Sequence, residues 1–266
     1  MAYDPQTIVT VHDNALVIFQ YVRTLNRLFH LLMARYVFNK GQWFTAVSPY
    51  MAASVQPWTK AKVAVVANPV VIPERTSLVK APLDRPVISV IVNGWDDRKN
   101  SKNALLAFRA VQRRYPAAVL WAMGTAFMAG DEAQEFCRQH DVQNVVFLGP
   151  TPHEEVLKRI AASTLVLHTS LEESFGMVLV EAMAYGVPVV AGQASGAVPW
   201  VVEDGGLLVD VTNVEAIADA VNKLLANAAL YEQLSARAVA IVAKRFPLVK
   251  IAEDYLALYA QVGKHK

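Results

Sequence analysis

Short, continuously apolar runs alternate with amphipathic stretches along almost the whole chain, and this alternation constrains the fold most. Strands covered on both faces read as unbroken runs of Val, Ile, Leu and Ala, and most of the runs here have that form. They lie at residues 8–11, 43–47, 63–66, 87–92, 118–123, 145–148, 165–168, 187–191 and 206–209. Repetition of strand, helix and strand predicts an α/β chain with a parallel, doubly wound sheet.

The stretches between these runs place apolar residues at helical spacing. Helices are predicted at 17–38, 102–114, 131–140, 153–162, 177–185 and 214–225, and the chain finishes in two more, at 229–246 and 248–262. Asn213 is placed to cap the helix that begins at Val214. Gly186 followed by Pro188 is placed to end the helix that begins at Met177.

A proline-rich segment separates two blocks of the chain. Residues 68–86 hold four prolines and no periodic element, which is typical of a linker between domains. The block after it has six predicted strands, enough for a complete nucleotide-binding sheet, whereas the block before it has three. We therefore predict a partial N-terminal domain over 1–73, a linker over 74–86, a ligand-binding domain over 87–246 and a C-terminal helical segment over 247–266.

Composition and charge exclude several classes of protein. The chain is 54% apolar and 18% charged, which rules out a disordered chain. Its net charge of +2 argues neither for nor against nucleic acid, but residues 1–73 hold six basic and two acidic side chains. The single cysteine, Cys137, excludes an internal disulfide framework and fits a reducing cytosol. No run is long and apolar enough to span a membrane, so we expect a cytoplasmic protein.

The most informative stretch is 169–191, TSLEESFGMVLVEAMAYGVPVVA. A strand leads into a loop with two carboxylates, Glu172 and Glu173, and then a helix opens after Ser174. Ligands of open parallel sheets bind beyond the carboxyl ends of the strands, which is where this loop lies. Backbone amides at the start of the helix can face a phosphate, and Gly176 lets the backbone approach it closely.

Glu181 lies inside this same helix, whose other residues over 177–184 are all apolar. A buried carboxylate needs a polar partner, so its presence here indicates a specific contact. Met177 and Glu181 are four residues apart and share a helix face. Glu181 therefore lies one turn beyond the phosphate end of the helix, at about the distance of a ribose from a bound diphosphate.

Glu173, seven intervening residues, Glu181 and the following Ala-Met-Ala-x-Gly-x-Pro-Val-Val-Ala resemble the signature of the retaining glycosyltransferases of family four. The resemblance runs from about Ile8 to the C-terminus and includes the segments 148–149, 169–170 and 205–209. It implies the GT-B fold: one complete Rossmann-like parallel-sheet domain, here with a partial N-terminal Rossmann-like domain. It further implies that the last helix crosses back to the N-terminal part.

The resemblance also implies roles for individual residues. Glu173 would lie at the transferred sugar, and Glu181 would bind the hydroxyls of the nucleotide ribose. Backbone amides after Ser174 would contact the sugar or the diphosphate. The donor-binding residues implied in this way are Gly94, Arg98, Lys99, Ser174, Phe175, Gly176, Met177, Val178 and Glu181.

A second constellation, VNGWDDRKNSKN at 92–103, follows the first strand after the linker. A glycine at a strand end followed by Arg98 and Lys99 is typical of a diphosphate-binding loop. Arg can donate hydrogen bonds to two oxygens at once, and Lys supplies a point charge. Lys99 matches the family's lysine, but Trp95 stands where the family has an arginine, and Arg98 is the candidate to replace that arginine. Asp96 and Asp97 lack the supporting carboxylates of a metal site, and the family needs no metal.

His12 follows the first strand, in the sequence TVHDN. By itself it could be a structural histidine, whereas the resemblance matches it to a histidine that approaches the sugar from the cleft between the domains. Asp13 is its neighbour, with a weaker case. The other histidines have no metal-ligand spacing and are interpreted as structural or surface groups; they are His30, His140, His153, His168 and His265.

The resemblance predicts sugar transfer with retention, from a UDP- or GDP-sugar to a glycan or lipid-linked acceptor, without a metal or other cofactor. The alternative is a nucleotide-sugar-binding module without activity, in which a partner chain or a second copy completes the short N-terminal domain. A nucleotide-sugar epimerase shares the fold, but the family motif argues against it. The basic segment 15–43 is either a core-packed helix or an interfacial helix in peripheral contact with a membrane, and it does not indicate nucleic acid.

Overall fold

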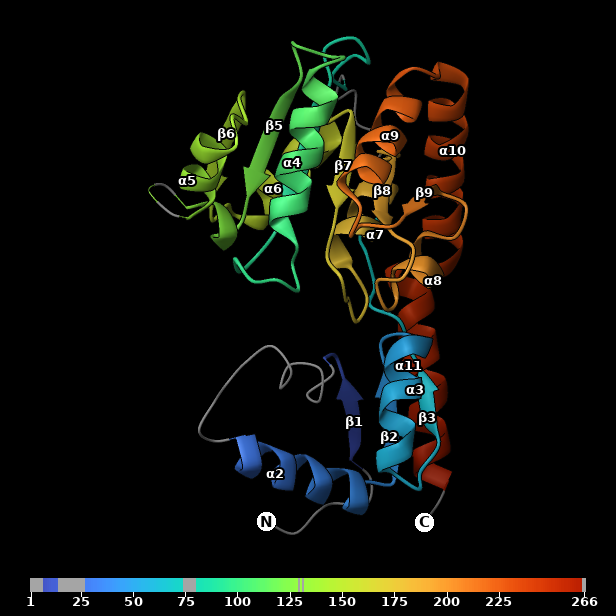
Figure 1. The fold of residues 1–266 in the computed structure, drawn as a ribbon. Coiled ribbons are helices and arrows are strands. Elements are labelled where there is room, and N and C mark those ends of the chain that lie inside the picture. Colours follow the sequence, from blue (N-terminus) through green and yellow to red (C-terminus); the bar gives the residue numbers. More distant parts are fainter. Residues whose placement is uncertain (1–6, 14–26, 74–79, 129, 131, 265–266) are drawn as a thin grey trace. The chain divides into compact units, whose positions relative to one another are not determined.

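The structure is a computed structural model of the chain, and it describes residues 7–13, 27–73, 80–128, 130 and 132–264. The chain forms two compact units (Figure 1). The smaller unit comprises residues 1–69 together with 246–266, and the larger unit comprises residues 70–245.

The larger unit is built on a six-stranded parallel sheet. Its strands lie side by side in the order β6 (Val145–Gly149), β5 (Val119–Met123), β4 (Val87–Ile91), β7 (Leu165–His168), β8 (Val189–Gly192) and β9 (Gly206–Val209). Counted along the chain this order is 3-2-1-4-5-6, which is typical of a Rossmann-like sheet. The order reverses between β4 and β7, and the carboxyl ends of these two strands therefore border the crevice in which such sheets bind ligands.

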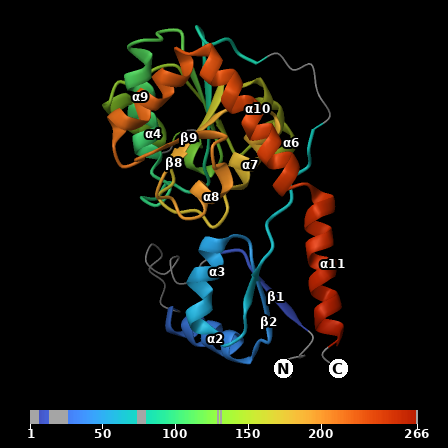
Figure 2. The same ribbon diagram turned by 90° about the vertical axis from the view of Figure 1, so that its right-hand side faces the viewer.

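Helices cover both faces of this sheet. α4 (Ser101–Gln112) and α9 (Val214–Leu225) pack together on one face, and α6 (His153–Ala162) and α7 (Met177–Ala184) lie on the other (Figures 1 and 2). The remaining helices of the unit are α5 (Glu132–Gln139), α8 (Val198–Val202), α10 (Ala228–Arg245) and the short 3-10 turn η2 (Thr125–Phe127).

The burial of the strands explains their sequence. Every residue of β7 and β8 is buried, because helices cover these strands from both sides. Ile88 on β4 pairs in register with Leu120 on β5 and Leu165 on β7, and all three side chains are fully buried. The unbroken apolar runs of the sequence are thus the central strands of a parallel sheet, as predicted.

The smaller unit holds a three-stranded parallel sheet, in the order β1 (Ile8–Val11), β2 (Trp43–Ala46) and β3 (Val63–Val65). Its helices are α2 (Arg27–Lys40), α3 (Pro49–Val55) and α11 (Leu248–Lys264), with the 3-10 turn η1 (Gln56–Trp58). α11 returns from the end of the chain to this sheet, since Lys250, Asp254 and Leu258 line a cavity of about 520 Å³ together with Phe44 and Val65. Figure 2 shows α11 along one side of this unit.

The predicted fold class is confirmed: the chain is α/β with parallel, Rossmann-like sheets. All nine predicted strands are present, within two residues at their ends. Asn213 caps α9 as predicted, its Oδ1 accepting from the Ala216 amide at 3.0 Å. Of the helix predicted at 17–38, residues 17–26 lie outside the described part of the chain, and the rest belongs to α2.

The sequence analysis missed α3, α8 and the two 3-10 turns. A signal for α3 was available, because Ser48 precedes Pro49 at the first helical position. The Ser48 Oγ accepts from the Met51 amide at 3.2 Å, which caps the helix. α8 is only five residues long and has no capping side chain, so Pro199 at its second position is the only comparable signal that its described residues carry.

The predicted linker at 74–86 lies partly outside the described residues. In its described part, which belongs to the larger unit, Ala81 pairs with the segment from the end of α6 to β7: the Ala81 amide donates to the Ala162 carbonyl at 3.0 Å, and the Thr164 hydroxyl donates to the Ala81 carbonyl at 3.1 Å. Within the described ranges, no helix combines the length and the apolar character that crossing a membrane requires.

Candidate functional site at the switch point of the larger sheet

Two polar loops meet at the carboxyl ends of β4 and β7. Lys99, from the loop after β4, donates from Nζ to Oε1 of Glu173, from the loop after β7, at 2.7 Å. The two side chains are 16% and 15% exposed. Residues that are 74 positions apart in the chain thus form an ion pair at the point where the strand order reverses.

Asn100 fixes the loop that carries Lys99. Its backbone is left-handed, with φ 52°, a conformation that Asn tolerates better than most residues. Its side-chain amide donates to the carbonyls of Thr169 at 3.1 Å and Val211 at 2.7 Å, and the Thr169 hydroxyl donates back to the Asn100 carbonyl at 3.0 Å. The loops after β4, β7 and β9 are therefore tied together directly beside Lys99.

The start of the same loop is also braced. Gly94 has φ +88°, and its amide donates to the Thr125 hydroxyl at 3.0 Å. Asp96 Oδ1 accepts from the Lys99 amide at 3.0 Å. Trp95, at the position of the family's arginine, packs edge-on against two aromatic rings at 6.0 and 6.3 Å, those of Phe136 and Phe127. Trp95 thus anchors the loop to the core of the unit.

His168, the last residue of β7, lies against Glu173. It is 5% exposed, and its Nε2 is 3.4 Å from the Glu173 Oε1. Burial acts to raise the pKa of the Glu173 carboxyl, but His168 and Lys99 outweigh it and hold that pKa well below the usual range for Glu. Glu173 is therefore a fixed anion at neutral pH.

The sequence analysis interpreted His168 as a structural or surface histidine, and its contact with Glu173 was missed. A signal was present in the sequence, because a polar residue ends an otherwise apolar buried strand five residues before the predicted catalytic glutamate. The backbone of Glu173 is held as well, since its carbonyl accepts from the Ala197 amide at 2.9 Å.

The N-terminus of α7 faces the same region. Gly176 precedes the helix with φ +91°, and a Cβ at this position would meet Leu179 Cδ1 at 3.1 Å. Within the described part of the chain, the amides of Gly176 and Met177 donate to no acceptor. Ser174 and Phe175 are buried, and Val178 is half-buried. This end of the helix can therefore offer backbone donors and its positive dipole to an anion.

Arg98 forms the neighbouring ion pair. Its Nη1 is 4.0 Å from Oε2 of Glu172, and its carbonyl accepts from the Leu171 amide at 2.8 Å. Arg98 and Lys99 thus each face one of the two consecutive glutamates. The two cations and the loop after β7 are held against each other by backbone and side-chain contacts alike.

Glu181 has the polar partner that its burial requires. It is 7% exposed on α7, and its Oε1 lies 2.7 Å from Nε2 of His153, the first residue of α6. The sequence analysis missed this partner and interpreted His153 as a structural or surface group. The neighbouring positions on α7 are fully buried and apolar, so His153 supplies the one polar side-chain contact that the described residues give Glu181.

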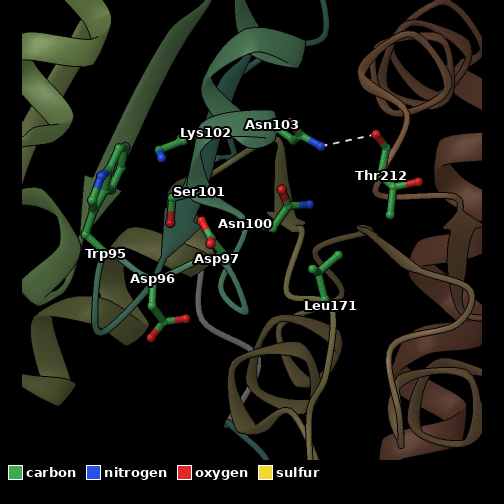
Figure 3. A pocket seen from close by; sticks show the side chains of 9 residues that line it. All are labelled: Trp95, Asp96, Asp97, Asn100, Ser101, Lys102, Asn103, Leu171 and Thr212. Atoms are coloured by element: carbon green, nitrogen blue, oxygen red, sulfur yellow. Dashed lines mark hydrogen bonds between the residues drawn. The ribbon is translucent and has the colours of Figure 1, made fainter. Parts of the chain in front are cut away.

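A cavity of about 270 Å³ opens between the loop after β4 and the first turn of α4. Figure 3 shows its lining, in which the Asn103 side chain donates to the Thr212 carbonyl at 3.3 Å. Asp96 and Asp97 line the cavity, whereas Lys99 and Glu173 do not. Among the described residues, no group of three or more His, Cys, Asp or Glu side chains could hold a metal ion.

His12 belongs to the smaller unit, where it follows β1 and is exposed. β1 itself is tied to β2 by the Thr45 hydroxyl, which donates to the Thr10 hydroxyl at 2.8 Å. The role of His12 stays a prediction.

Fold and site together define a Rossmann-like α/β protein with a cluster of charged and polar side chains at the switch point of its larger sheet. Residues 77–240, well over half of the chain, match the family described as glycosyl transferases group 1, and the chain belongs to that family. The family resemblance found in the sequence is thereby confirmed.

Two curated relatives illustrate the family. The chain is 31% identical over 184 residues to N-acetyl-alpha-D-glucosaminyl L-malate synthase of Bacillus anthracis, which covers 66% of this chain and 45% of that protein. It is 44% identical over 97 residues to D-inositol 3-phosphate glycosyltransferase of a Nocardioides species, covering 36% of this chain and 21% of that protein. The chain thus spans less than half the length of these relatives.

Solved structures share the fold. Sucrose-phosphate synthase of Thermosynechococcus elongatus superposes with a TM-score of 0.80 at 22% identity, over 98% of this chain and 69% of that one. Anabaena HepE in complex with UDP-glucose superposes with a TM-score of 0.78 at 22% identity, over 96% of this chain and 72% of that one. These are GT-B glycosyltransferases, and the predicted GT-B-like fold is confirmed.

Proposed function

We propose that the chain binds a nucleotide diphosphate sugar and transfers the sugar, with retention at the anomeric carbon, to a glycan or lipid-linked acceptor. The observation that carries the proposal is the Lys99–Glu173 ion pair of 2.7 Å beside the N-terminus of α7. A cation, backbone donors and a fixed anion are the groups needed next to a leaving diphosphate and a developing sugar cation.

The donor would lie along α7. Its diphosphate would face Lys99, Arg98 and the amides of Gly176 and Met177, and its ribose hydroxyls would meet Glu181 one turn further along the helix. This arrangement follows the rise of the helix and the preference of helix N-termini for anions. Gly94, Ser174, Phe175 and Val178 complete the proposed donor site.

The charges suit departure of the diphosphate. As the bond between the anomeric carbon and the diphosphate oxygen breaks, negative charge grows on the diphosphate, and Lys99 and the helix amides would stabilise it without a metal ion. Glu173 is held as an anion, so it would stabilise the oxocarbenium-like carbon rather than donate a proton. The acceptor oxygen would attack from the face that the diphosphate leaves, and the acceptor's proton would pass to the diphosphate.

The names of related proteins support the class of donor. Anabaena HepE was solved with UDP-glucose and with UDP and glucose. The Bacillus anthracis relative carries the name N-acetyl-alpha-D-glucosaminyl L-malate synthase, which contains a glycosyl group. We therefore propose UDP-sugars as the first donors to test and GDP-sugars as the second, with His12 on the side of the acceptor.

The test follows the release of free nucleotide from UDP- and GDP-sugars, with light scattering to give the mass of the particle. We expect release by the wild type and a fall in kcat of about 100- to 1,000-fold in Lys99→Ala and in Glu173→Ala. Lys102→Ala is the matched control for Lys99, because Lys102 is an exposed lysine three residues away. Glu154→Gln is the control for Glu173, because Glu154 is 82% exposed.

Unchanged turnover in folded Lys99→Ala and Glu173→Ala would reject the proposed roles. Tight binding of the nucleotide sugar without release would instead favour a binding module. A mass of twice the chain or more in light scattering would then direct the search to a second copy or a partner that completes the site.

A further inference from the structure

We propose that His153 is a positioning residue for the donor's ribose. Its imidazole holds one oxygen of Glu181, so that the other oxygen of the same carboxylate faces the ribose hydroxyls. This inference rests on the proposed function, and it adds a residue on a second helix, α6, to the donor site.

The first step of the argument is the bond itself. His153 Nε2 and Glu181 Oε1 are 2.7 Å apart, which is a short charge-assisted contact. For His153 to donate to the carboxylate, the ring must carry its proton on Nε2. No other hydrogen bond or ion pair of the His153 side chain occurs among the described residues.

The second step is the difference in burial between the partners. The Glu181 side chain is 9% exposed, whereas that of His153 is 71% exposed. An imidazole this open adds little to the apolar core, so burial alone does not account for its place at the start of α6. Its one polar contact in the described structure is with the carboxylate that we propose for the ribose.

The third step concerns the remaining oxygen. Among the described residues, no group donates to Oε2 of Glu181. Because this oxygen is nevertheless not one of the buried atoms left without a partner, it is accessible to solvent. A carboxylate with one oxygen fixed and the other accessible is oriented for an incoming hydroxyl pair. α6 packs beside α7, so both helices begin at the carboxyl edge of the sheet, where the diphosphate would lie.

The experiment measures equilibrium binding of UDP, GDP and ADP, each alongside its 2′,3′-dideoxy counterpart. The wild type should bind at least one of the ribose-bearing diphosphates more tightly than its dideoxy form. His153→Ala should weaken that ribonucleotide about tenfold, the scale of one lost hydrogen bond to a charged group, and leave the dideoxy form unchanged. Donor KM should rise by the same factor while kcat is kept.

Two conservative variants separate positioning from structure. The amide of His153→Gln can reach the place of Nε2, so this variant should restore most of the ribonucleotide affinity. The shorter His153→Asn should not. Lys158→Ala is the control on α6, because Lys158 is also largely exposed and pairs with Glu154, away from Glu181.

The outcomes distinguish the inference from the function on which it rests. If the wild type binds none of the three diphosphates, the proposed function and the inference both fail. If it binds, and His153→Ala binds the ribonucleotide equally well, only the inference fails. An equal loss of ribo and dideoxy ligands in His153→Ala also overturns it, because a general structural role would act on both.

Discussion

Lys99 and Glu173 form an ion pair between the loops that follow β4 and β7, with 2.7 Å between Nζ and Oε1. The strand order of the larger sheet reverses between these two strands. Water screens this pair only partly, since both side chains are mostly buried. His168 adds a third group at 3.4 Å from the same carboxylate oxygen. The three side chains therefore form one electrostatic unit, and changes to any of them should be coupled.

A double-mutant cycle on this pair should show strong coupling in unfolding. Lys99→Met leaves a mostly buried carboxylate without its closest cation, and we expect a loss of about 1–3 kcal/mol in the free energy of unfolding. Glu173→Gln in the same chain should recover part of that loss, so the double variant costs less than the sum of the single ones. Urea denaturation measures the cycle.

The exposed pair Lys158–Glu154, also at 2.7 Å, serves as the control. Solvent screens it, so its cycle should show much weaker coupling than that of Lys99 and Glu173. Equal coupling in the two cycles would contradict the description of Lys99 and Glu173 as a shielded pair.

The depressed pKa of Glu173 predicts a loss of stability in acid. Its pKa in the folded chain lies below the ordinary value of 4.5, so the unfolded chain binds this proton more readily. The resulting stability is fully present above about pH 4.5 and is lost as the pH falls toward the lower, folded value. Unfolding at pH 7 and pH 3.5 should show a smaller drop in Glu173→Gln than in the wild type.

Glu132→Gln is the control for this pH dependence, because Glu132 is an exposed carboxylate on α5 of the same unit. It should follow the wild type from pH 7 to pH 3.5. A wild-type-sized drop in Glu173→Gln would show that other groups cause the acid loss.

The sequence predicted the larger sheet well because burial on both faces leaves a direct mark. The runs at β7 and β8 are apolar at nearly every position, and the described structure buries them completely. Short elements left weaker marks: α8 has five residues and no capping side chain, and its early proline alone does not distinguish a helix from a loop.

The sequence also predicted part of the candidate site, namely the residues that lie in local motifs. Glu173, Glu181 and Lys99 lie in local motifs, so the sequence alone indicated them. His168 was missed although its partner Glu173 lies only five residues further along the chain. His153 was missed because its contact is made across the fold: it meets Glu181 28 positions away, through the packing of α6 on α7. A histidine's neighbours along the chain carry no record of such a partner.

Gly176→Ala should weaken both stability and nucleotide binding. The residue has φ +91°, where a side chain is strained, and its Cβ would press on Leu179 at 3.1 Å. We expect a cost of about 1–3 kcal/mol in thermal unfolding, together with weaker binding of UDP, because the first turn of α7 must shift. Gly130→Ala is the matched control: it has φ +83° but nothing within 4 Å of a Cβ.

Gly130→Ala should therefore share the backbone strain but keep the wild-type affinity for UDP. If Gly176→Ala and Gly130→Ala bound UDP with equal affinity, the amides at the start of α7 would not be part of the diphosphate site.

Asn100→Gly should separate the side-chain bonds of Asn100 from its backbone conformation. Glycine adopts φ 52° without strain, so the variant loses only the bonds to the carbonyls of Thr169 and Val211. We expect a cost of about 1–3 kcal/mol in urea unfolding, since the Thr169 carbonyl loses the Asn100 donor and the Val211 carbonyl keeps only the donor from Asn103. UDP should also bind more weakly, because Lys99 is adjacent. Asn144→Gly is the control, with the same φ of 52° and an exposed bond to the Pro116 carbonyl. If Asn100→Gly cost no more than Asn144→Gly, the ties between the loops after β4, β7 and β9 would not be what holds Lys99 in place.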